Sequence, residues 1–320
     1  MQRPKSKVQG PKSLIAALRP ESVHAPDITL WALGLLVVGL LIFAAFQALS
    51  ADSRQSVTLG SGLKTQDSAL SVFAASSLKE AFTECGKNFQ AANPNLTDLH
   101  FNFQGSQALV AQLQQGAPAD VFASADKASM DRAAQAGLIE GAPRELARNL
   151  LTVVLPGDNG RDQSRPYGNI RTLKDLARPG VKLSLADPAV PVGAYTLQML
   201  DKLSADPVYG AGFKRQALGN VVSYEDNVRQ VLTRVQLGEV DAGVVYATDA
   251  LAANAGSGGS VQPVNTLVIP DKYNVVAVYY VGAVKGAAHP GAARAWINYV
   301  LSGAGQGVLA KYGFSPAANP

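Results

Sequence analysis

Two serines stand where short apolar runs give way to helical patterns, and side chains at such positions can bind an anion. Ser77 follows the apolar run 72–75, with Ser76 beside it, and Ser106 follows the run 101–105. The start of a helix carries unpaired backbone N–H groups and about half a positive charge. Hydroxyls at two such starts therefore predict one bound anion that both serines face.

Each serine also has an ordinary structural interpretation as a helix cap. Ser77 and Glu80 match the Ser-x-x-Glu capping box, in which both side chains accept bonds from backbone N–H groups. Ser106 follows Gly105, which lets the backbone approach a ligand closely, and Asp126 is the expected cap of the next helix. Capping and anion binding are compatible, because a hydroxyl that accepts from the backbone keeps its own hydrogen to donate.

Further polar groups stand at two helix starts and one strand end. The Pro/Gly-rich loop 187–195 runs into a helix, so the backbone N–H groups of residues 192–194 would point out of its start. Segment 224–229 opens another helix, for which we expect Asp226 as the cap. Tyr246 ends an apolar strand with a phenol, which can donate one hydrogen bond.

Residue types that catalysis or metal binding would need are sparse. His100 and His289 are the histidines of the expected globular part, and the sequence has no Gly-x-Ser-x-Gly elbow, His-Glu-x-x-His motif or Cys/His cluster. The single cysteine, Cys85, excludes an intrachain disulfide, and its spacing with Phe82 and Phe89 predicts a buried helix face. We therefore expect neither an enzyme nor a direct cation site.

The charges are distributed unevenly along the 320 residues. The whole excess of +4 falls before residue 67, where seven Lys or Arg face three acids, and residues 67–320 carry 21 charges of each sign. A globular part with balanced charge lacks the basic surface of a nucleic-acid-binding protein, so we expect no nucleic-acid partner.

An uncharged apolar run, residues 28–49, follows a basic leader, residues 1–27. The run is about as long as a bilayer's hydrocarbon layer is thick, and the basic flank favours a cytoplasmic N-terminus with the remainder exported. An uncleaved transmembrane anchor and a signal segment cleaved before Ala51 are both open. Residues 50–68 have the Ser/Gly/Thr/Asp composition of a linker. Both alternatives predict an extracytoplasmic protein, in a periplasm or at the cell surface.

From residue 69 onward, strand patterns alternate with helical ones, which predicts an α/β fold. The expected strands are 70–74, 99–103, 120–124, 150–155, 182–186, 221–222, 242–246 and 273–281. We expect parallel strands with helices on both faces. Two such sets joined by long apolar strands predict two lobes, with a ligand cleft beyond the C-terminal ends of the strands.

Several segments, taken together in this order, are typical of one family. They are Val-Phe-Ala-Ala-Ser-Ser-Leu at 72–78, Gly-Ala-Pro-Ala-Asp-Val-Phe-Ala-Ser-Ala-Asp at 116–126, Asp-Pro with Val-Pro-Val-Gly at 187–193, Gly-Val-Val-Tyr at 243–246 and Lys-Tyr-Gly-Phe at 311–314. Over about residues 69–315 the chain resembles the molybdate-binding proteins of ABC importers. The resemblance implies a two-lobed periplasmic-binding-protein fold, type II-like, with lobe I at 69–148 and 268–320 and lobe II at 149–267.

The resemblance implies that the lobes close on a tetrahedral oxyanion, molybdate or tungstate, and deliver it to a membrane permease without a cofactor. Matching positions imply hydroxyl and backbone donors at Ser77 and Ser106, backbone N–H donors at Val192 and Val228, and a phenol donor at Tyr246. Before Val228 the chain has Glu-Asp-Asn, one residue longer than the Glu-Asp of the family pattern.

Two other functions stay open. A site of neutral donors suits a fully deprotonated anion, because the O–H of hydrogen phosphate would be left unpaired at a cost of about 1–3 kcal/mol. A binding protein for another solute, such as sulfate or an organic acid, is the first alternative, and an exported hydrolase is the second. We expect a monomer whose partners are the oxyanion, the permease and, through residues 28–49, the membrane.

Overall fold

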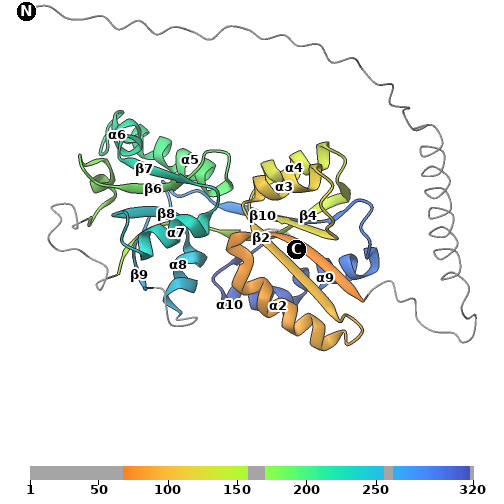
Figure 1. The fold of residues 1–320 in the computed structure, drawn as a ribbon. Coiled ribbons are helices and arrows are strands. Elements are labelled where there is room, and N and C mark those ends of the chain that lie inside the picture. The colour runs from red at the N-terminus through yellow and green to blue at the C-terminus, as the bar shows by residue number, and fades with distance from the viewer. Residues whose placement is uncertain (1–67, 158–169, 256–261, 318–320) are drawn as a thin grey trace, which may run out of the picture. The chain divides into compact units, whose positions relative to one another are not determined.

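Two mixed β-sheets organise the part of the chain that the computed structural model describes, residues 68–157, 170–255 and 262–317 (Figure 1). The α/β fold class is therefore as predicted. The predicted leader and apolar segment, and the linker up to residue 67, lie outside the described residues. Within these residues, no helix has the length and apolar character needed to cross a membrane.

The first sheet has the strand order β11-β4-β10-β3-β1-β2. Its strands are β1 Ala69–Ala75, β2 Asp98–Gln104, β3 Val121–Ser124, β4 Ile139–Asn149, β10 Ala277–Val284 and β11 Ser315–Pro316. β1 pairs in parallel with β2 and β3, whereas β10 runs antiparallel between β3 and β4. Within this sheet, the prediction of parallel strands is right for β1 to β3 and wrong for β4, β10 and β11, which pair antiparallel. Local patterns cannot show that a strand near residue 280 returns to pair with one near residue 122.

The second sheet has the strand order β7-β6-β8-β5-β9. Its strands are β5 Leu151–Pro156, β6 Leu183–Ala186, β7 Val221–Glu225, β8 Ala242–Tyr246 and β9 Val264–Leu267. β6 pairs in parallel with β7 and β8, and β5 pairs antiparallel with β8 and β9. Each sheet thus has three neighbouring parallel strands whose carboxyl ends share one edge.

Helices cover both faces of each sheet (Figure 1). Around the first sheet they are α2 Lys79–Ala92, α3 Ser106–Gln114, α4 Lys127–Gln135, α9 Pro290–Leu301 and α10 Gly303–Lys311, and around the second α5 Pro191–Ala205, α6 Phe213–Gly219, α7 Val228–Gln236 and α8 Ala247–Asn254. In Figure 1, α3 and α4 lie on one side of the first sheet and α2, α9 and α10 on the other.

The alternation of side chains along β1 explains how one strand serves two helical layers. Val72 packs with Phe82 and Trp296 in the larger core, whereas Phe73 belongs to a second cluster with Met130. Strands covered on both faces are largely apolar, and β1 has a single polar residue, Ser71, near its start. Cys85 is fully buried on the α2 face that the sequence predicts, and burial raises the pKa of its thiol to about 12.

The chain passes between the sheets twice, from β4 to β5 and from β9 to β10. Asn274, on the second passage, holds the two passages together. Its side-chain Oδ1 accepts from Leu151 N at 3.0 Å and its Nδ2 donates to Leu151 O at 2.9 Å. β9 stops opposite Val153, so the Asn274 amide continues the hydrogen-bond ladder beside β5 by one further pair.

Candidate functional site

A pocket between the two sheets contains all five residues that the sequence analysis selected. It encloses about 200 Å³ of space, part of it open to solvent. Its lining comprises Ala75, Ser76, Ser77, Gln104, Gly105, Ser106, Ala125, Val190, Pro191, Val192, Val228 and Tyr246. None of these lining residues is charged, so a ligand bound here would meet hydrogen-bond donors, hydroxyl groups and apolar surface.

Strand order explains why residues from six separate segments meet. The lining segments follow the carboxyl ends of β1, β2 and β3 in the first sheet and of β6, β7 and β8 in the second. Ligands of open α/β sheets bind at such edges. Three of the segments begin the helices α3, α5 and α7, whose first N–H groups have no partner within the helix.

Val192 and Val228 lie in the first turns of α5 and α7, so their backbone N–H groups are available at the pocket. The start of α5 packs tightly on the preceding loop. A Cβ atom at Gly193 would come within 2.1 Å of the Asp187 carbonyl oxygen, so this position requires glycine. The loop and the helix start therefore form one close-packed unit beneath Val192.

Ser106 is buried at the first residue of α3, and it does not cap the helix. Its Oγ accepts from the backbone N–H of Ala125 at 3.0 Å, which leaves the hydroxyl hydrogen free to donate. The residue before it, Gly105, allows the two halves of the pocket to approach each other, because a Cβ atom there would lie 2.5 Å from the carbonyl oxygen of Asp226.

The expected capping box at Ser77 and Glu80 is absent from the described structure, so this prediction is wrong. A 3₁₀ turn, Ser76–Leu78, precedes α2 and places Leu78 at the cap position. The Ser77 hydroxyl instead lies 2.8 Å from the phenol oxygen of Tyr279, and the Glu80 carboxylate accepts from Arg229. Both side chains are therefore used in tertiary contacts.

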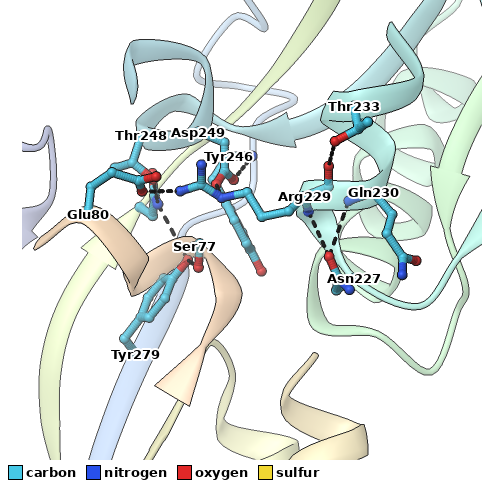
Figure 2. Close-up of polar contacts among 11 residues, drawn as sticks. Ser77, Glu80, Asn227, Arg229, Gln230, Thr233, Tyr246, Thr248, Asp249 and Tyr279 are labelled. Atoms are coloured by element: carbon cyan, nitrogen blue, oxygen red, sulfur yellow. Dashed lines mark hydrogen bonds and ion pairs between the residues drawn. The ribbon is translucent and has the colours of Figure 1, made fainter. Parts of the chain in front are cut away.

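A neighbouring residue also replaces Asp226 as the cap of α7. Asn227 Oδ1 accepts from the backbone N–H groups of Arg229 at 3.0 Å and Gln230 at 3.2 Å (Figure 2). The backbone carbonyl of Asp226 accepts from Gln107 Nε2 at 2.8 Å. The additional residue before Val228 thus supplies the cap. The predicted cap at Asp126, by contrast, is confirmed by its bond from Ser129 N at 3.1 Å.

The phenol of Tyr246 faces the pocket without a hydrogen-bond partner among the described residues. Tyr246 is 1% exposed, and this burial raises the pKa of its phenol well above the usual value of 10. The phenol therefore keeps its hydrogen. A buried polar hydrogen without a protein partner is rare, and it points to a ligand that accepts from it.

Behind the pocket, Arg229 lies between two carboxylates, Glu80 on α2 and Asp249 on α8 (Figure 2). Its Nε is 2.9 Å from Asp249 Oδ1, and Asp249 Oδ2 accepts from the backbone N–H of Tyr246 at 3.2 Å. Asp249 is fully buried. Burial raises the pKa of its carboxyl to about 6, with Arg229 lowering it and Glu80 raising it. The sequence analysis selected neither Arg229 nor Asp249, because a charged residue in a predicted helix usually indicates a solvent-exposed position.

The two histidines lie apart from the pocket. His289 contacts Asp120 at the amino-terminal end of β3, with 3.2 Å between Nδ1 and Oδ2, and His100 pairs with Asp98 on β2. Among the described residues, no group of three or more His, Cys, Asp or Glu side chains could hold a metal ion. The pocket lining thus contains serine hydroxyls without an adjacent histidine base.

Comparison with known proteins points to one class. The sequence model of the family "Bacterial extracellular solute-binding protein" matches residues 70–315. The chain is 35% identical over 280 residues to the molybdate-binding protein ModA of Mycobacterium tuberculosis, covering 87% of this chain and 96% of that protein.

Solved structures share the fold. The periplasmic molybdate-binding protein of Azotobacter vinelandii matches with a TM-score of 0.62 and 20% identity, over 78% of this chain and 99% of its own. The sulfate-binding protein SubI of M. tuberculosis matches with a TM-score of 0.66 and 19% identity, over 79% of this chain and 88% of its own.

The raised pKa of Asp249 predicts a specific pH dependence of stability. The folded protein holds this proton up to about pH 6, whereas the unfolded chain releases it near pH 3.8, so the stability contributed by the proton falls as pH rises between these values. Relative to Asp249→Asn, the wild type should lose up to about 3 kcal/mol of unfolding free energy over this window. Urea unfolding of both proteins at several pH values measures the difference. A difference that stays flat or grows with pH would contradict the assignment.

Proposed function

Because the chain belongs to the bacterial extracellular solute-binding proteins, we propose that it binds molybdate outside the cytoplasm and delivers it to the permease of an ABC importer. The relative at 35% identity over most of both chains is named for molybdate binding, which agrees with the resemblance found in the sequence. The observation that carries the proposal is the uncharged pocket in which Ser77, Ser106, Val192, Val228 and Tyr246 meet.

We infer that each sheet and its helices form one lobe, residues 69–148 with 268–320 and residues 149–267, as in type II-like periplasmic binding proteins. The two passages between the sheets would then be the hinge. Strand membership supports this division, since β5 to β9 all fall within the second range and the remaining strands fall in the first, apart from Asn149, the last residue of β4. The pocket lies between the lobes, where closure would remove a ligand from water.

The donors suit a tetrahedral dianion without bound protons. Backbone N–H groups at Val192 and Val228 donate only, Ser106 keeps a hydrogen to donate, and the Tyr246 phenol has no partner in the described protein. Hydrogen bonds to a charged acceptor are stronger than those between neutral groups, and the dipoles of three helix starts add to them. Tungstate has the same charge and shape as molybdate, so we propose it as a second ligand.

Two contacts would hold the lobes closed over the anion. Arg229 of the second lobe bonds Glu80 of the first, and Gln107 of the first bonds the Asp226 carbonyl of the second. Both contacts use the segment that begins α7, whose Val228 N–H faces the pocket. The movement that closes the lobes would therefore also bring the Val228 N–H to the other donors of the pocket.

Sulfate is the second candidate, because it is also a fully deprotonated tetrahedral anion and a sulfate-binding protein shares the fold. The two anions differ in size, and affinity measurements separate them. A hydrolase is a weaker hypothesis, because neither Ser77 nor Ser106 has a histidine partner in the described structure. We infer a binding role without catalysis for a monomer, which residues 28–49 would anchor in the membrane or which would be released after cleavage of a signal segment.

Calorimetric titration of the purified protein with molybdate, tungstate, sulfate and hydrogen phosphate tests the proposed function. We expect one site per chain with molybdate and tungstate bound most tightly and hydrogen phosphate most weakly. If sulfate bound most tightly, sulfate would replace molybdate as the proposed ligand. Absence of both heat and thermal stabilisation at millimolar molybdate would refute the proposal.

Tyr246→Phe should separate binding from stability. The substitution removes no hydrogen bond to the described protein, so the unliganded protein should keep its unfolding free energy. It removes a donor to the anion, which should weaken molybdate binding by about 1–3 kcal/mol, or about fivefold to 150-fold. Tyr273→Phe is the control, because the Tyr273 phenol donates to Asp206 away from the pocket, and its loss should lower stability and leave affinity unchanged. Equal molybdate affinity of Tyr246→Phe and wild type would remove Tyr246 from the site.

Glu80→Gln should speed release of the anion. The substitution removes the negative charge with which Glu80 of the first lobe binds Arg229. It leaves Arg229 paired with Asp249 in the second lobe. A weaker contact between the lobes should lower affinity about threefold to tenfold, from a net contribution of about 0.5–1.5 kcal/mol, mainly through the dissociation rate. Glu84→Gln is the matched control on the same helix, because Glu84 bonds Lys311 and Tyr312 within one lobe. Stopped-flow dissociation rates that change equally in both variants would speak against a closing contact.

A further inference from the structure

A chain of hydrogen bonds runs from the pocket serine Ser77 into the protein. Ser77 Oγ lies 2.8 Å from Tyr279 OH, and Asn149 Nδ2 lies 3.4 Å from the same phenol oxygen and 2.8 Å from Thr248 Oγ1. All four side chains are buried. Figure 2 shows Ser77 and Tyr279 meeting at their oxygens, with Thr248 and Arg229 nearby. Neither Tyr279 nor Asn149 lines the pocket, so they act on a ligand only through Ser77.

The direction of these bonds is fixed from the inner end. Asn149 Oδ1 accepts from the backbone N–H of Leu150 at 2.9 Å, which orients the amide so that its Nδ2 group faces Tyr279 and Thr248. An amide nitrogen only donates, so the Tyr279 oxygen must accept from Asn149. Tyr279 has one hydrogen of its own, and Ser77 Oγ is the acceptor within reach.

The Tyr279 phenol keeps that hydrogen at all ordinary pH values. The residue is fully buried, and burial raises the pKa of its phenol well above the usual value of 10. Ser77 Oγ therefore accepts from Tyr279, and the hydrogen of Ser77 is left for the pocket. The reverse arrangement, in which Ser77 donates to Tyr279, would direct the phenol hydrogen at an amide group that cannot accept it.

We propose that Tyr279, oriented by Asn149, is a specificity-determining positioning residue that holds the Ser77 hydroxyl as a donor toward the bound oxyanion. The inference rests on the proposed function and concerns which anions the same pocket rejects. A protonated oxyanion needs an acceptor for its O–H, and a serine hydroxyl that could turn would supply one. With its direction fixed, Ser77 presents its own hydrogen to the O–H of a protonated anion, and this contact disfavours that anion.

Competition of hydrogen phosphate against molybdate tests the inference, at mildly alkaline pH where phosphate carries one proton. In Tyr279→Phe, Ser77 regains the freedom to accept. We expect molybdate affinity to fall about tenfold while the preference for molybdate over hydrogen phosphate falls by at least fivefold. Tyr312→Phe is the matched control, because its phenol lies 2.8 Å from Glu84, remote from the pocket, and its preference should equal that of the wild type.

The combined variant Ser77→Ala with Tyr279→Phe distinguishes action through Ser77 from a general loosening. If Tyr279 acts through Ser77, adding Tyr279→Phe to Ser77→Ala leaves the preference unchanged. Equal weakening of molybdate and hydrogen phosphate in Tyr279→Phe, no competition by phosphate even in that variant, or a further change in the combined variant would each overturn the inference. Failure of the wild type to bind molybdate would instead refute the proposed function, which the first titration reveals.

Discussion

The pocket is lined by uncharged residues, and the proposed function requires this lining to hold a doubly charged anion, which is the constraint on which the rest of the structure depends. Without a cation to neutralise the ligand, every oxygen must meet a donor that already points inward before the ligand arrives. The fold meets this demand by bringing three parallel strand ends from each sheet to one edge and starting helices there. Main-chain N–H groups are held by the helices themselves, so their direction costs no side-chain entropy.

The charges that the pocket lacks lie directly behind it. Arg229 follows Val228, yet its guanidinium turns away from the pocket to Glu80 and Asp249. Two carboxylates around one guanidinium leave no surplus positive charge to attract anions indiscriminately. Asp249 also accepts from Tyr246 N, so the same cluster fixes the backbone from which the phenol extends. A buried charge cluster here contributes orientation more than attraction.

Patterns at strand ends and helix starts pointed to Ser77, Ser106, the backbone of residues 192–194 and Tyr246, whereas Val228 came from the family resemblance; all of the selected site residues line the pocket. Tyr279 and Arg229 were not predictable, because a tyrosine within a strand and an arginine within a helix acquire their roles from contacts across the chain. β4 was missed for the same reason. Its sequence contains Gly141, Pro143 and four charged residues, and its buried apolar residues are Ile139, Leu146 and Ala147, so it forms a strand by pairing with β10 from far along the chain. The cap of α7 fell on Asn227 because adjacent Asp and Asn are both good caps, and backbone geometry decides between them.

The position of Asn149 in the chain affects when the pocket could distinguish protonated from unprotonated anions. It ends β4, the last strand before the chain first crosses to the second sheet, and its amide contacts both Tyr279 of the first sheet and Thr248 on a helix of the second. A rotation of one sheet against the other would break only the contact of Asn149 with Thr248, because Ser77, Tyr279 and Asn149 all belong to the first sheet and the segments that flank it. Ser77 would therefore keep its direction whether the protein is open or closed. Discrimination between protonated and unprotonated anions would then begin at the first encounter, before the lobes close over the ligand.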